Sequence, residues 1–427
     1  MLDQIKIGIL ILLSVITVSC KVFQKSITPR NLERIYDPAS SSIHPDITVY
    51  NTSDTSSLIV ERVYTKELLF NNANSENILL ARLKVICNVY DINDKYNLVD
   101  SLTTTYKFDK NSNILYHTLE IPFNSVIGND YILEIITSDL NRKSHQYTFR
   151  RIDRTKEVSP LDFAFFNKLN GEVLLKPFIK DNREFGIKTY KKNYDSLYVH
   201  FFTNDFEVSK PPYLNDTLVE NVETSDTTWT CYLDSINYEN FNNEGIYYFT
   251  EDKNLDLNRG FPLFNFGKGF PLVQTPSDLA KPIVYLDSLD LIPDIDSTEK
   301  LTKLAVDNYW LDKANNMDKS RELLKIYYNR VMFANMYFTS YKEGWQTDRG
   351  MIYIIYGLPD YLFKSGKEER WIYNPEGAGT GITFTFNYAE SPFSLNHYVL
   401  DREKLKATAW NEAIKMWEKG EIMYFQN

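Results

Sequence analysis

The chain is poor in the residues that build covalent cross-links and metal centres. It has three cysteines and five histidines among 427 residues. Three cysteines are too few for a disulfide-stapled scaffold or a multi-cysteine zinc site. None of the histidines forms a pair with metal-ligand spacing such as HxxxH. We therefore predict neither a metal site nor another cofactor.

The chain also lacks an excess of positive charge. Its formal net charge is −10, which disfavours binding to nucleic acid, because a basic surface supplies most of that affinity. Beyond residue 20, no stretch approaches the roughly 20 apolar residues that a bilayer span requires. Hydrophobic residues make up 43% and charged residues 24%, as in folded globular proteins. At about 100–200 residues per domain, the length predicts two to four domains.

The first 20 residues predict where in the cell the protein is located. Lys6 precedes an apolar run over 7–18, and Ser19 stands directly before Cys20. The run has the length of a signal-peptide core and is too short for a bilayer span. The pattern resembles a bacterial lipoprotein signal, which implies removal of residues 1–19 and lipidation of Cys20. A plain secretory signal with an incidental cysteine is the alternative.

Residues 20–45 are predicted to be a lipidated tether, because they contain three prolines and the run Ser40–Ser42 but little periodicity. In the Bacteroidetes-type lipoproteins that this signal resembles, an acidic cluster after the lipidated cysteine often accompanies export to the cell surface. Residues 21–30 carry no such cluster. The resemblance therefore implies an outer-membrane lipid anchor on the periplasmic face, with the cell surface as the alternative.

The next 240 or so residues show the period-two alternation of half-buried strands. Apolar side chains alternate along 81–89 and again along 115–123, with turn residues between such runs. We predict a β-sandwich-like (Ig-like) domain over 46–155 and a second β-rich domain over 156–284. Cys87 and Cys231 fall in the apolar register of strands, which predicts buried free thiols.

A group of phenylalanines lies near the end of the second β-rich region, where the sequence GFPL occurs at 260–263 and again at 269–272. Two interpretations stay open: an exposed aromatic surface for a carbohydrate, or a plug between this region and the C-terminal domain. The group comprises Phe261, Phe264, Phe266 and Phe270.

The pattern changes to helical spacing after residue 290. A capping-box-like start at Asp296 and a second start near Ser320 predict a pair of helices. Strands are predicted over 351–356, 370–374 and 382–388, and a final helix from about Asp401 carries two tryptophans on one side. The fold class predicted is thus mostly β, with a helix pair plus a small antiparallel sheet forming an α+β domain over 285–427.

One short motif stands out between the helix pair and the predicted strands. Residues 344–350 read GWQTDRG, and YGLPD follows at 356–360. Each residue type suits a structural corner: a glycine that ends a helix in the left-handed conformation, a large apolar anchor, turn-forming polar residues, and an arginine that can pair with a nearby aspartate. A groove for a partner peptide is the alternative. The candidate site residues are Gly344, Trp345, Thr347, Asp348, Arg349, Gly350 and Asp360, with Arg349 expected to pair with Asp348 or Asp360.

This motif, together with the sequence ERWIY at 369–373, resembles the GWxTD-domain family of Bacteroidetes and Acidobacteria over about residues 285–400. The resemblance implies a domain and no particular reaction. A Ser/His/Asp arrangement can be drawn around His397, from Ser394, Glu390 and Asp401, but it lacks a GxSxG nucleophile elbow. We therefore predict no catalytic residues.

These observations lead to an expected function. The chain is expected to be a non-enzymatic, outer-membrane-tethered lipoprotein. It would act as an accessory or scaffold subunit of an outer-membrane assembly, secretion or gliding-type machine. Its partners would be a membrane β-barrel protein or other lipoproteins, and not nucleic acid. The alternatives are a glycan- or peptidoglycan-binding lipoprotein and a hydrolase with an unrecognised site.

Overall fold

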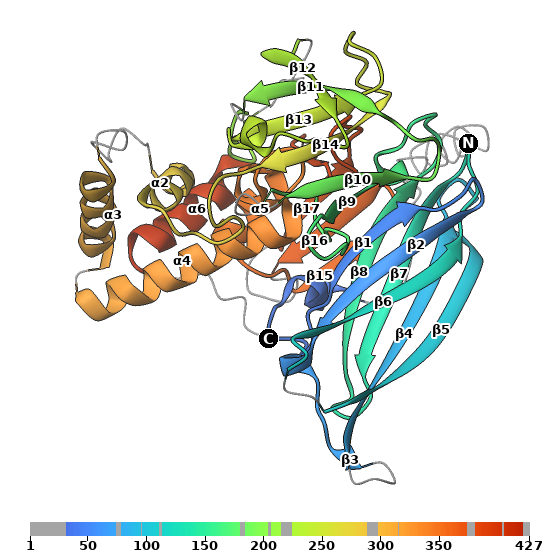
Figure 1. Cartoon of the computed structure of the whole chain (residues 1–427). Helices are drawn as coiled ribbons and strands as arrows, with labels where there is room; N and C mark the ends of the chain where they lie inside the picture. Colours follow the sequence, from blue (N-terminus) through green and yellow to red (C-terminus); the bar gives the residue numbers. More distant parts are fainter. Residues whose placement is uncertain are drawn as a thin grey trace, which may run out of the picture.

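The computed structural model shows three packed parts, two of them built from strands and one from helices around a small sheet (Figure 1). The predicted fold class, mostly β with a C-terminal α+β domain, is confirmed. Cys20 and the predicted signal peptide lie outside the described residues. Among the described residues, no helix is long and apolar enough to cross a bilayer. The structure describes residues 31–73, 78–94, 96–110, 113–179, 184–203, 206–214, 224–287, 298–314, 316–373, 381–403 and 405–421.

The first part is a sandwich of two antiparallel sheets. One sheet has the order β1-β2-β6, and the other has the order β3-β4-β7-β8 with β5 on the remaining edge of β4. The alternation predicted over 81–89 is confirmed, because its apolar side chains are at most 2% exposed and Cys87 among them is a free thiol. The elements are β1 (Asp46–Asn51), β2 (Ser56–Tyr64), η2 (Thr65–Glu67), β3 (Asn72–Ala73), β4 (Leu79–Asp91), β5 (Asn97–Asp109), β6 (Tyr116–Asn124), β7 (Asp130–Asp139) and β8 (Ser144–Asp153).

One carboxyl group lies inside this sandwich. Glu61 of β2 is fully buried and accepts a hydrogen bond from the hydroxyl of Thr137 on β7 in the facing sheet. Its other oxygen, Oε2, has no hydrogen-bond partner within the described chain. Burial raises the pKa of this carboxyl from 4.5 to about 7, because an ionised group is poorly solvated there. The folded state therefore favours the protonated form of Glu61.

We expect Glu61→Gln to remove part of the pH dependence of stability. A carboxyl whose pKa is raised by folding stabilises the native state at low pH, and that contribution is lost as pH rises from about 4.5 through about 7. The wild type should lose on the order of 3 kcal/mol relative to the variant between pH 4 and pH 8. Urea unfolding of both proteins across this range measures the difference, in which other titrating groups cancel. A difference in unfolding free energy between the two proteins that stays the same at all pH values would contradict the raised pKa of Glu61.

The second part is also β-rich. A four-stranded antiparallel sheet of order β12-β11-β13-β14 packs beside the hairpin β10-β9. Cys231 is buried and free, as predicted. The elements are η3 (Pro160–Asp162), β9 (Phe163–Asn167), β10 (Phe185–Thr189), β11 (Ser196–Thr203), β12 (Thr227–Tyr232), η4 (Tyr238–Phe241), β13 (Gly245–Thr250) and β14 (Gly260–Asn265).

The phenylalanine group joins this part to the C-terminal domain. Phe261 lies in the core of the second part. Phe264, Phe266 and Phe270 are at most 8% exposed and form a cluster with Tyr341 and other rings. The plug interpretation is therefore confirmed for these three rings. The exposed-surface interpretation is wrong, because the hydrophobic effect drives adjacent rings into the junction between the two parts.

The C-terminal part combines helices with a small antiparallel sheet of order β15-β16-β17-β18. The helix pair is confirmed, while the final helix begins six residues later than expected and Asp296 lies outside the described residues. The elements are α2 (Pro276–Ala280), η5 (Lys281–Tyr285), α3 (Glu299–Ala314), α4 (Met317–Phe338), η7 (Gly344–Gln346), α5 (Asp348–Tyr356), β15 (Tyr361–Lys364), β16 (Glu368–Tyr373), β17 (Ile382–Tyr388), β18 (Tyr398–Leu400) and α6 (Ala407–Glu418).

The tryptophans of α6 are buried inside their own domain. Trp410 and Trp417 are 4% and 2% exposed, and the indole N–H of Trp417 donates to the carbonyl of Ile355 in α5 at 3.1 Å. The ring of Trp410 lies 6.2 Å from that of Tyr356. The apolar stripe of this helix is thus used for internal packing.

The second half of the predicted tether is packed against the rest of the molecule. The short helix η1 (Glu33–Tyr36) lies between β15 and β8. The amide of Leu32 donates to the carbonyl of Leu362 in β15 at 2.9 Å, and Leu32 is 2% exposed. The amide of Ser42 donates to the side chain of Ser144 at 3.0 Å. This segment therefore contacts both the first sandwich and the C-terminal domain.

Candidate functional site

The GWQTDRG motif forms the corner between α4 and the buried helix α5. Residues 351–356 are helical, so the strand predicted there is wrong. Thr347 caps the helix by accepting the amide of Gly350 at 3.1 Å, and Gly357 ends it with a φ of +81°. All nine residues of α5 are buried. A short apolar run that is buried on every side carries no periodicity that separates helix from strand.

The two glycines of the motif allow a close approach of backbones. A Cβ on Gly344 would lie 1.9 Å from the carbonyl oxygen of Ala334 in α4. A Cβ on Gly350 would lie 1.9 Å from the carbonyl oxygen of Gly344. The left-handed helix end predicted for Gly344 is wrong, because α4 already ends at Phe338. Gly350 lies in the first turn of α5 and so does not precede a strand.

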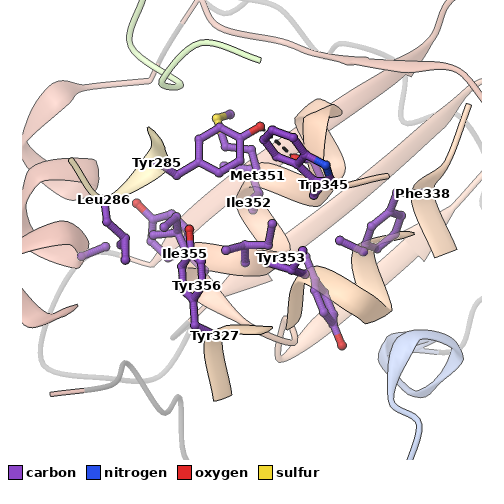
Figure 2. Close-up of a cluster of buried hydrophobic side chains, with 14 of the residues drawn as sticks. Tyr285, Leu286, Tyr327, Phe338, Trp345, Met351, Ile352, Tyr353, Ile355 and Tyr356 are labelled. Carbon is purple, nitrogen blue, oxygen red and sulfur yellow. Dashed lines mark hydrogen bonds between the residues drawn. The ribbon is translucent and has the colours of Figure 1, made fainter. Parts of the chain in front are cut away.

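Trp345 anchors the corner in the core of the domain. Its side chain is 4% exposed and lies against Tyr285, Met351 and Ile352 in Figure 2. The hydroxyl of Tyr285 donates to the carbonyl of Trp345 at 2.8 Å, which is the dashed line of that figure. The amide of Trp345 donates to the side chain of Asn335 in α4 at 3.0 Å. Both its ring and its backbone are therefore fixed.

Asp348 joins the start of α5 to the end of the sheet and to the second β-rich part. Its carboxylate accepts the amide of Leu400 at 2.7 Å and pairs with Arg402 at 2.5 Å and 3.0 Å. Arg402 in turn donates to the carbonyl of Lys210 at 3.2 Å. This two-contact ion pair is nearly buried on both sides, so it fixes the relative position of three chain segments.

Arg349 enters a buried cluster of charges. Its guanidinium pairs with Glu369 of β16 at 2.9 Å and donates twice to Asn396 at 2.8 Å. The sequence predicted Asp348 or Asp360 as the partner of Arg349, and this prediction is wrong, because Asp348 pairs with Arg402 instead. Asp360 lies at the turn before β15, where its amide donates to the carbonyl of Ile372.

Glu369 is the centre of this cluster. It has no exposed surface and pairs with both Arg349 and Lys364, while the hydroxyl of Tyr36 donates to its Oε2 at 3.0 Å. Burial alone would raise the pKa of this carboxyl, but the two adjacent cations lower it to about 2. The same contacts raise the pKa of Lys364 above its usual value. We refer to these four residues as the Glu369 cluster.

Sequence reasoning missed Glu369 and Lys364 as members of the site. A signal existed for Glu369, because it shares the alternating face of Trp371 and Tyr373 in ERWIY, and this face is buried. Tyr36 offered no such signal. It reaches the cluster only because η1 packs beside β15, 333 residues away from Glu369 along the chain.

The residues proposed around His397 do not assemble into a triad. Burial, with Lys342 and Arg349 nearby, lowers the pKa of His397 to about 4, so its ring is neutral at neutral pH. Its Nδ1 has no hydrogen-bond partner within the described ranges, and its ring lies 4.9 Å from that of Tyr341. No hydrogen bond joins its ring to Glu390 or Asp401 in that part of the chain. In the same ranges, no group of three or more His, Cys, Asp or Glu residues is placed to hold a metal ion.

We compared the chain with curated proteins, with solved structures and with models of protein families. None of the curated proteins matches the sequence. Solved structures of β-glucuronidase from Bacteroides uniformis, including a calcium-binding mutant of β-glucuronidase 2, align at 11–12% identity with TM-scores of 0.17–0.18. These alignments cover 35–38% of this chain and 15–16% of the enzyme chains, and so carry no inference. The chain thus spans less than a fifth of the enzymes' length.

A family model, by contrast, matches a continuous part of the chain that includes the whole corner. It covers residues 245–419, from the first residue of β13 to the end of α6. The match begins within the second β-rich part, earlier than the predicted boundary at 285. It includes β14 and the residues after it, whose Phe264, Phe266 and Phe270 pack against the C-terminal part. Residues 245–419 of this chain are therefore a GWxTD domain, and the protein is a GWxTD-domain protein.

Proposed function

We propose that the protein is a lipid-anchored scaffold subunit of an outer-membrane assembly, secretion or gliding-type machine, and that its GWxTD domain holds the molecule in one shape for docking. The observation that carries the proposal is that both charged residues of the motif bind groups from other parts of the molecule. Asp348 is bound through Arg402 to the second β-rich part, and Arg349 is bound through Glu369 to Tyr36. Polar groups so engaged stabilise a relative arrangement of parts, as a scaffold requires.

The position of the N-terminal segment supports the anchoring part of the proposal. Asn31 donates to the carbonyl of Asp360 at 2.8 Å, at the start of β15. Eleven residues connect a lipid on Cys20 to this point, which is a reach of at most about 40 Å for a fully extended chain. A lipidated Cys20 would therefore keep the GWxTD domain close to the membrane surface, where a β-barrel protein or another lipoprotein is available for docking.

The proposal is tested by isolating the tagged full-length chain from detergent-solubilised, cross-linked membranes. We expect a membrane β-barrel protein or another lipoprotein to co-purify at a constant ratio. Cys20→Ala is the control: the variant should leave the membrane fraction, because one acyl-carrying residue supplies the anchor, and it should melt like the wild type. Membrane retention of a correctly processed Cys20→Ala variant would contradict the anchor.

Two results would favour the alternative functions. Retention of the purified chain on peptidoglycan or another polysaccharide, with no protein partner, would indicate a glycan-binding lipoprotein. Hydrolysis of an ester or peptide that is lost in His397→Gln, with the fold intact, would indicate a hydrolase. Either result would replace the scaffold proposal.

A further inference from the structure

The strand β5 forms an outer edge of the first sandwich. It pairs with β4 on one side, and no strand of the described chain pairs with its other side. In Figure 1 it is the outermost strand on the right of the molecule. In an antiparallel pair, the N–H and C=O groups of every second residue point away from the neighbouring strand. About six residues of this strand therefore present backbone donors and acceptors to the outside.

Several other edges of the described sheets are protected. Pro122 lies in β6 and Pro262 in β14, and proline removes a backbone donor from an edge. Leu32 covers β15, and η1 lies against β8. The edge strand β12 has only six residues. Proteins commonly use such devices to keep sheet edges from pairing with other chains.

The outer edge of β5 carries none of these devices along most of its length. Between Asp100 and Lys107 its sequence is SLTTTY, which has no charge and no proline and favours strands. A bulge opposite Val89 and Tyr90 affects only its first residues. From residue 100 to residue 109 the pairing with β4 is regular, so the outer edge is straight enough to accept another strand.

The same segment is complementary to itself. In an antiparallel pair of two β5 strands with the two-fold axis at Thr104, Thr103 lies opposite Thr105, and Leu102 lies opposite Tyr106. Each of these pairs occurs twice, and threonine pairs and aromatic–aliphatic pairs are favourable across strands. No two like charges face each other in this register. Pairing over 100–108 forms roughly eight to ten backbone hydrogen bonds, a number usual for a specific interface.

We propose that the protein forms a two-fold symmetric dimer in which the β5 edges of two copies pair and join the sandwiches into one continuous sheet. This inference does not depend on the lipid anchor or on the proposed function. An isologous interface of this kind closes on itself, because each copy uses its β5 edge for the other and leaves none of that edge for a third copy.

An apolar patch at the beginning of β5 is consistent with this arrangement. Leu98 and Val99 are 49% and 47% exposed, and Val126 and Ile127 in the loop after β6 are 46% and 44% exposed. The amide of Asn124 donates to Asp100 at 2.9 Å, which holds that loop next to β5. In the dimer, the end of the second copy's β5 passes this patch and removes part of it from water, which adds hydrophobic stabilisation to the backbone ladder.

Sedimentation equilibrium of the full-length chain in density-matched detergent tests the proposal. The wild type should sediment as a dimer at micromolar concentration. The double variant Thr103→Lys with Thr105→Lys should be monomeric, with at least a tenfold weaker association, because it places like charges opposite each other twice. The matched control is Thr227→Lys with Thr383→Lys, which adds the same charge at exposed positions of other strands and should remain dimeric.

A second measurement locates the contact. Cys87 and Cys231 are buried. In a Cys20→Ala background, a cysteine introduced by Thr103→Cys should therefore be the site at which a short bis-maleimide joins two copies, whereas Thr383→Cys should give little cross-linked dimer. A monomeric wild type, or a dimer that the β5 variant leaves intact, would overturn the proposal. Pairing of β5 with a different protein, detected as a heterologous cross-link in membranes from a monomeric wild type, would also overturn it.

Discussion

Replacing Glu369 by glutamine is expected to lower the free energy of unfolding by about 3–5 kcal/mol, one of the two largest single-residue effects that we expect in this chain. The substitution preserves the shape of the side chain but removes its charge. Arg349 and Lys364 would then be two buried cations without a counterion, since both pair with this carboxylate. Chemical denaturation of the purified chain at neutral pH measures the loss.

The pH dependence distinguishes an ionic effect from a packing effect. A carboxylate whose pKa is lowered by folding stabilises the native state above its unfolded pKa of about 4.5, and this contribution is lost as pH falls toward about 2. The difference in unfolding free energy between the wild type and Glu369→Gln should therefore have its full value at pH 6 and be smaller at pH 3. Glu368→Gln, on the opposite face of the same strand, should change stability by less than about 0.5 kcal/mol. A similar loss in both variants would contradict the role assigned to the Glu369 cluster.

Trp345→Ala is expected to be comparably destabilising, at about 3–5 kcal/mol, because it deletes a large side chain from a packed core. The neighbours that would line the cavity include Tyr285 and Met351, which are themselves held by the surrounding helices (Figure 2). Thermal and denaturant unfolding should both show the loss. Tyr232→Ala is the control, since that ring is 60% exposed and its removal should be nearly neutral.

The same variant separates the two interpretations of the motif. If Trp345→Ala unfolds like the parent but loses a partner that the parent binds, the corner is a recognition groove and not a structural anchor. If stability falls and any binding falls only in proportion to the unfolded fraction, the ring acts as an anchor.

The architecture follows from the sequence wherever one simple periodicity dominates. Period-two alternation along 81–89 and the helical stripe of α4 describe segments with one buried face and one exposed face, and both are confirmed. The helix α5 was predicted to be a strand because it is buried on all sides, so no contrast between faces remains in its sequence. The residue in the sequence that indicates a helix here is Thr347, which caps the N-terminus of α5.

The contacts of the motif could be predicted from the sequence less well than the motif itself. Turn chemistry explains Thr347 locally, but the partners of Asp348 and Arg349 lie 54 and 20 residues away, and Tyr36 joins them from the other end of the chain. A local pattern carries no information on which distant charge meets a buried arginine. Alternation along β16 places Glu369 on the inner face, so a search for charged residues on buried faces would have found it.

The packing of residues 31–36 determines how a mechanical load travels through the molecule. Tension applied to the chain ahead of Asn31 acts first on the hydrogen bonds between this segment and β15, and then on the Tyr36 contact to Glu369. Because η1 also lies against β8, part of the load reaches the first sandwich through that contact. As long as these contacts hold, a pull on the N-terminal segment is shared between the GWxTD domain and β8, and the strands that follow η1 in the chain are not pulled apart one after another.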